Sequence, residues 1–126
     1  MKAFNPQNRP KFPANRESLQ ISANNIIKIL DENSRLSNQA VATYEQAAGL
    51  MTNEQQRRGT TMAVSALKTS LQIDDLFKSQ VQLVFDEKIV NEKTFNERFL
   101  AIANQIREAS RIHDAQLTEG KRLLGL

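Results

Sequence analysis

Prolines are confined to the beginning of this 126-residue chain, and none follows Pro13. Proline breaks helices because it lacks an amide proton and its ring clashes with the preceding turn. Glycine, the next strongest helix breaker, occurs only four times, at positions 49, 59, 120 and 125. The chain after Pro13 can therefore form very long helices, with few places at which it can turn.

The first 16 residues differ from the rest and are predicted to form an extended basic arm. They contain all three prolines and four cations but no acid, which gives a local charge of +4. Proline and the residue before it avoid the helical region of the backbone. The net charge of the whole chain is +3, so residues 17–126 together carry −1. The basic character of the protein therefore resides in the arm.

The arm is also a candidate binding element. Its large apolar groups, Phe4 and Phe12, can anchor in pockets of a partner. Arg9 and Lys11 can attract an acidic surface and raise the association rate. We therefore predict that these four residues bind a partner.

Apolar residues recur every three or four positions along three long segments, a pattern typical of amphipathic helices. The first segment runs from about residue 17 to residue 50 and carries Asn33 and Ser37 within its apolar stripe. Either one long helix contains a polar layer or the chain bends between residues 31 and 39. One continuous helix is favoured, because neither proline nor glycine interrupts it. The second segment ends near Ile89 or Val90, and the third runs to Gly120.

The first reversal of the chain has two solutions. In one, Gly49 ends the first helix and Thr52 caps the second, with Gln55 completing a capping box. In the other, the first helix continues to Gly59, and Thr60 or Thr61 caps the second. The second reversal is predicted from Thr94 as the helix N-cap, with Glu97 three residues later.

The predicted fold is all-α: an antiparallel bundle of three long helices, residues 17–120, preceded by the arm and followed by a short apolar tail, residues 121–126. In an up-down-up bundle the first and third helices run parallel. If they start level, near residues 17 and 94, Asn33 and Ser37 meet Ser110 and His113 in one polar layer, which would fix the register of the helices. His113 is therefore expected to be partly buried and structural.

Residue types and spacing argue against an enzyme. The chain has no cysteine and one histidine, which excludes disulfides, thiolate metal sites and the paired Glu-x-x-His motifs of di-iron bundles. No glycine-rich phosphate loop, nucleophile elbow or His-Glu-x-x-His motif occurs. Six of its fourteen carboxylates form three adjacent pairs, and the two members of such a pair point about 100° apart on a helix. We expect no catalytic residues, no metal and no cofactor.

The second helix carries more apolar circumference than two neighbouring helices need to cover. Large exposed apolar patches usually mark interfaces. The residues of this helix predicted to bind a partner are Ile73, Leu76, Phe77, Val81, Val84 and Phe85.

These features favour a structural or assembly protein that oligomerises or docks on a larger complex, such as a virion or a secretion apparatus. Two alternatives stay open: a regulatory adaptor that holds a partner in a helical groove, and a nucleic-acid-binding accessory protein that uses the arm. Protein partners are expected, in a homo-oligomer or a large assembly. No 18-residue apolar run and no Sec-type signal peptide are found, so we predict residence in the cytoplasm or within an assembled particle.

Overall fold

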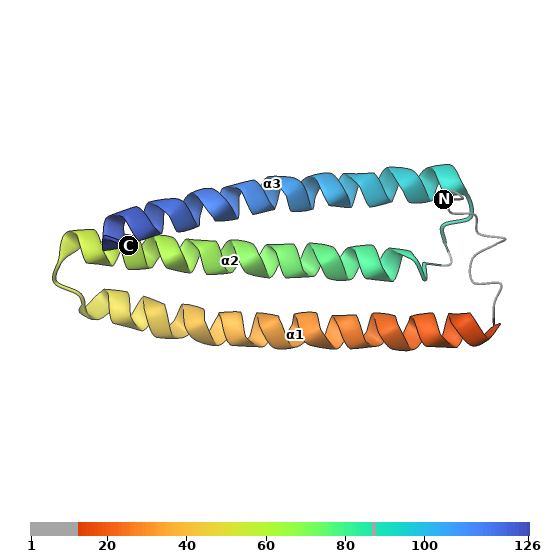
Figure 1. Cartoon of the computed structure of the whole chain (residues 1–126), viewed down its shortest axis with the longest axis horizontal. Helices are drawn as coiled ribbons and strands as arrows, with labels where there is room; N and C mark the ends of the chain where they lie inside the picture. The colour runs from red at the N-terminus through yellow and green to blue at the C-terminus, as the bar shows by residue number, and fades with distance from the viewer. Residues whose placement is uncertain (1–12, 87) are drawn as a thin grey trace.

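The computed structural model of this protein contains three long helices, each antiparallel to the next (Figure 1). It describes residues 13–86 and 88–126, with side chains from Gln20 onward. The helices are α1 (Pro13–Leu50), α2 (Glu54–Leu83) and α3 (Glu92–Leu124). The predicted all-α fold of three long antiparallel helices is confirmed, and α1 runs without a break through residues 31–39. Across the described residues, no helix is long and apolar enough to cross a membrane.

The helix α1 begins at Pro13, four residues before the predicted start. Proline suits the first position of a helix, because its fixed φ is helical and the amide proton it lacks would have no helical acceptor there. The remainder of the predicted arm, residues 1–12, lies outside the described residues.

The helices lie side by side in a single layer with α2 in the middle (Figure 1). α1 packs against α2 and α2 packs against α3, whereas within the described residues no Cα atom of α1 comes within 8 Å of one in α3. The expected polar layer between α1 and α3 is therefore wrong: α2 separates Asn33 and Ser37 from Ser110 and His113. His113 is still partly buried, as expected.

The first reversal follows the solution at Gly49. α1 ends at Leu50, and Asn53 caps α2 by accepting a hydrogen bond from the backbone N–H of Gln56 at 3.0 Å. Asn53 thus takes the role expected of Thr52. Gly59, the stop in the other solution, is buried within α2.

The second reversal begins earlier than predicted, because α2 ends at Leu83 rather than near Ile89. Ile89 is only 2% exposed and packs in a cluster with Leu83 and Phe95. The turn is held by Asp86, whose Oδ1 accepts a hydrogen bond from the backbone N–H of Lys88 at 2.9 Å. Burying Ile89 against α2 and α3 takes precedence over continuing the helix.

The N-cap of α3 is Asn91, three residues before the predicted Thr94. The Oδ1 atom of Asn91 accepts a hydrogen bond from the backbone N–H of Thr94 at 2.8 Å. Asparagine caps helices at least as well as threonine, so Asn91 suits this role.

Glycines allow α2 and α3 to approach closely near the C-terminus. A Cβ atom at Gly59 would lie 2.7 Å from Cγ of Leu124, and one at Gly120 would lie 3.4 Å from the carbonyl oxygen of Gly59. The prediction that Gly120 ends α3 is wrong, because the helix continues to Leu124 and ends at Gly125, whose φ is 77°. The first four residues of the predicted tail thus belong to α3, and Leu123 is buried there.

The core of this layer is small. Among the described residues, the buried apolar side chains are Ala23, Ala48, Val64, Ala66, Leu83, Ile89, Phe95 and Leu123. Half of these are alanine or valine, and many of the larger apolar side chains are not fully buried.

Candidate protein–protein interface

The layer has two broad faces, and residue spacing assigns side chains to each. Residues seven apart lie on the same side of a helix, whereas residues two apart point about 200° from each other. Lys68 of α2 pairs with Glu45 of α1, with 3.1 Å between Nζ and Oε1, which marks one face. Asp75, seven residues after Lys68, lies on the same side. Phe77, two residues further, therefore points to the opposite face.

The face that carries Phe77 is built from one row of residues on each helix, spaced by seven positions. We call it the uncharged face, because none of its twelve residues carries a charge. None of them is fully buried. They are Ile26, Asn33, Ala40 and Ala47 in α1; Ala63, Ser70, Phe77 and Val84 in and directly after α2; and Asn96, Ala103, Ser110 and Leu117 in α3.

Large apolar side chains of this face are well exposed. Ile26 is 46% exposed, Phe77 41% and Leu117 36%. Beside the row of α1, toward its outer edge, Ile29 and Leu36 are 62% and 50% exposed. An apolar surface that extends across several helices usually marks an interface.

The opposite, charged face holds ion pairs that join α1 to α2. Besides Lys68–Glu45, Lys78 donates a hydrogen bond to Oδ1 of Asp31 at 2.9 Å. The side chains of Lys68, Glu45 and Asp31 are more than half exposed. Exposed pairs of this kind contribute about 0–1 kcal/mol each, so they help to set the register of the two helices more than they stabilise the fold.

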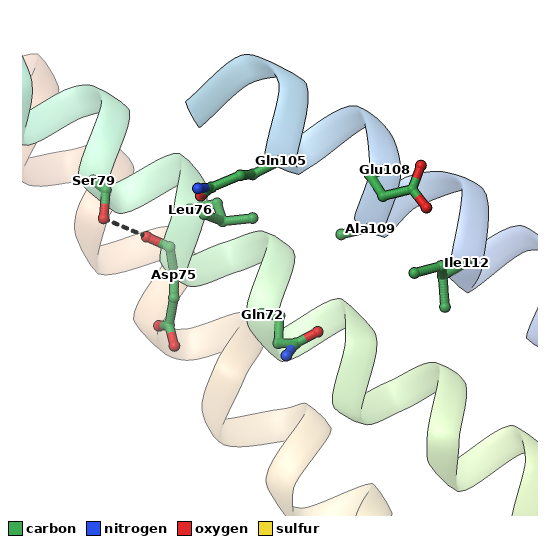
Figure 2. Close-up of a pocket in the computed structure, with 8 residues that line it drawn as sticks. All are labelled: Gln72, Asp75, Leu76, Ser79, Gln105, Glu108, Ala109 and Ile112. Carbon is green, nitrogen blue, oxygen red and sulfur yellow. Dashed lines mark hydrogen bonds between the residues drawn. The ribbon is translucent and has the colours of Figure 1, made fainter. Parts of the chain in front are cut away.

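A groove of about 490 Å³ lies between α2 and α3 on the charged face (Figure 2). Leu76 and Ile112 extend into the space between the two helices in this view, and they form its apolar floor together with Ala109. The polar residues around it are Gln72, Asp75, Ser79, Gln105 and Glu108.

The carboxylates of this groove are engaged by neighbouring cations. Asp75 lies 3.3 Å from Nζ of Lys78, and Arg111 donates two hydrogen bonds to Glu108. These hydrogen bonds hold the pKa of Glu108 below its ordinary value. A general acid needs a raised pKa to keep its proton near neutral pH, so Glu108 is poorly suited to that role.

Asp74 lies between α1 and α2, where it accepts a hydrogen bond from Oγ of Ser34 at 3.3 Å. Burial raises the pKa of Asp74 above its ordinary value, the bond from Ser34 opposes this in part, and the charge of Asp75 adds to it. The ionised carboxylate is therefore disfavoured in the fold relative to the unfolded chain.

Asp74→Asn is expected to raise the melting temperature at pH 7 by a few degrees at most, because the amide oxygen still accepts from Ser34 and the disfavoured charge is gone. A raised pKa means that the wild type gains stability as the pH falls from above the raised pKa toward the ordinary value of 3.8. The advantage of the variant should thus shrink with acid and vanish below that value. Thermal unfolding followed by circular dichroism between pH 3 and pH 7 tests this; a constant difference would contradict it.

The structure does not bring the six predicted residues of the second helix to one surface. Phe77 and Val84 share the row of the uncharged face, although Val84 also packs against the cluster around Leu83. Leu76 lies in the groove. The other three, Ile73, Val81 and Phe85, are partly buried.

The four predicted residues of the arm, Phe4, Arg9, Lys11 and Phe12, lie outside the described residues. The rows of α1 and α3 were not predicted to bind a partner. One signal in the sequence could have identified these rows. Charged residues such as Glu45 and Glu108 stand two positions before uncharged residues, Ala47 and Ser110, and therefore point to the opposite side of the helix.

Within the part of the chain that the structure describes, no three His, Asp or Glu side chains gather where they could hold a metal ion. Comparisons of this chain with protein-family models, with curated proteins and with solved structures find no match.

Proposed function

We propose that this protein is a non-enzymatic structural protein that self-associates through the uncharged face, as a building block of a larger assembly. The observation that supports this is the row of uncharged, incompletely buried residues on each of the three helices. Fully burying a large apolar side chain contributes about 1.5–3 kcal/mol, and Phe77 and Leu117, which are 41% and 36% exposed, forgo part of this in the single chain. A second protein surface would recover much of this free energy.

The size of the face suits a stable contact. A helix of 30 residues, the length of α2, is about 45 Å long, and neighbouring helices lie about 8–10 Å apart. Three helices therefore present roughly 1,000 Å² on one side, whereas a typical stable interface buries about 800 Å² on each partner.

The mass of the full chain in solution tests this function. Light scattering over a concentration series should give a mass that rises above the 14.3 kDa of one chain. Because the contact surface carries no charge, the association should persist when salt is raised, since salt weakens mainly the interactions between exposed charges. A mass of one chain at every concentration would contradict the proposal.

A further inference from the structure

We infer that the uncharged face pairs with the same face of a second copy. The two copies are related by a two-fold axis that lies between the two layers and runs perpendicular to the helices, which we call the crossing axis. Each helix then lies over its own counterpart and runs in the opposite direction. This inference rests on the proposed function, because it specifies the contact through which the chains would associate. The resulting dimer has two layers of three helices.

The shape and charge of the face favour a second copy as its occupant. A single helix is about 10–12 Å wide, so it would cover only one of the two seams, α1 with α2 or α2 with α3. A second three-helix layer covers both seams at once. Because the twelve residues carry no charge, the face can meet its own copy without like charges opposing each other.

Contacts between neighbouring helices show how the three helices are aligned along their length. Asp74 accepts a hydrogen bond from Ser34 of α1, and Thr69 donates one from Oγ1 to Oε1 of Gln116 of α3 at 2.7 Å. These pairs show which residues lie at the same height in the layer. Counting from them along antiparallel helices places Gln72 level with Leu36.

The row of α2 is complementary to itself in this arrangement. Its members, Ala63, Ser70, Phe77 and Val84, are centred at the height of Asp74 and place two small residues on one side and two larger ones on the other. A crossing axis at this height brings Ser70 opposite Phe77 and Ala63 opposite Val84. Small residues facing large ones allow two layers to interdigitate.

Two polar residues of α1, Asn33 of its row and the neighbouring Ser37, suit the same axis. Ser34 is level with Asp74, so the axis passes between Asn33 and Ser37 and brings each of them near the other in the second copy. Asn33 is exposed and Ser37 partly exposed, and an amide and a hydroxyl can form hydrogen bonds. A polar pair within an apolar seam sets the register of helices.

A two-fold axis parallel to the helices is less suitable. It would place α1 over α3, so that the exposed Ile29 and Leu36 would face the outer edge of α3, where Arg107 and Asp114 are exposed. Charged groups pressed against apolar ones lose hydration without gaining a partner. The crossing axis instead joins the apolar edges of α1 to each other.

Cross-linking tests this arrangement directly, because the chain contains no cysteine. In Leu36→Cys the new thiol should lie near its own counterpart, so a short bismaleimide reagent should link two identical chains. Gln72→Cys, at the same height on the charged face, is the matched control and should give no linked dimer. Asn33→Cys, an exposed position one turn away, serves if Leu36→Cys fails to fold. Circular dichroism checks the helix content of each variant.

A mixture of Leu36→Cys with a larger, tagged chain carrying Asp114→Cys separates the two axes. Links between Leu36→Cys chains support the crossing axis, whereas links mainly between the two kinds of chain would overturn it. A linked dimer of Gln72→Cys would also overturn it by placing the contact on the charged face. If the wild type associates but neither Leu36→Cys nor Asn33→Cys links, this pairing fails and the proposed function stands. If the wild type has the mass of one chain at every concentration, both fail.

Discussion

Replacing Ile89 by alanine is expected to lower the free energy of unfolding by about 3 kcal/mol, within the range of about 2–5 kcal/mol for such truncations in a core. Ile89 is 2% exposed and packs with Leu83 and Phe95, and the partly buried Val84 and Ile102 pack against this cluster. The truncation removes buried methyl groups and leaves a cavity where the α2–α3 turn meets both helices. Because the core of the layer is small, little other packing can compensate.

The adjacent Val90 provides a matched control, since its side chain is 74% exposed. Val90→Ala should change the free energy of unfolding by less than about 0.5 kcal/mol. Chemical denaturation of both variants and the wild type measures the difference. All three must be compared at one protein concentration, because association adds to the apparent stability. Small and equal effects of both changes would mean that the turn does not fold back onto the cluster.

The length and continuity of the helices were largely predictable, because they depend on local features: the positions of proline and glycine and the spacing of apolar residues. The continuity of α1 follows from the absence of breakers between Pro13 and Gly49. The arrangement of the helices was not predictable in the same way. Periodicity shows that α2 has a wide apolar arc, but it does not show which neighbour covers each part. The structure explains the width by placing α1 and α3 on opposite sides of α2.

The ends of the helices were less predictable, because several residues nearby can perform the same role. Asn91 and Thr94 are both good caps, and only the fold selects Asn91. Gly120 resembles a helix stop, but its lack of a side chain serves the close contact with Gly59 instead. Ile89 continues a helical pattern, yet its burial in the turn overrides local preference.

The candidate interface was found only in part from the sequence. Phe77 and Val84 were predicted, because α2 carries an evident apolar surplus. Ile26 and Leu117 were not predicted to bind a partner, because they lie in or beside the apolar stripes of their helices, which a closed bundle would cover. In the flat layer these stripes are only partly covered, so residues that looked like core become surface.

Phe77→Lys is expected to weaken self-association by at least about tenfold. Fully burying an exposed phenylalanine contributes about 1.5–3 kcal/mol, so covering the part of Phe77 that is still exposed contributes about 0.6–1.2 kcal/mol, and a two-fold contact contains the residue twice. The loss of burial is then about 1.2–2.4 kcal/mol, and each 1.4 kcal/mol corresponds to a factor of ten in affinity. Burying the lysine charge without a partner adds to this cost. Because Phe77 is 41% exposed in the single chain, the helix content should not change.

Gln82→Lys controls for the added charge. Gln82 is exposed on the same helix, and it points to the charged face because it precedes Val84 by two positions. Light scattering at a concentration at which the wild type is associated should give the mass of one chain for Phe77→Lys and the wild-type mass for Gln82→Lys. If both variants keep the wild-type mass, Phe77 lies outside the contact and the uncharged face is not the surface through which the chains associate. If both dissociate, charge alone disrupts the assembly, and a contact formed by the charged face explains the result better.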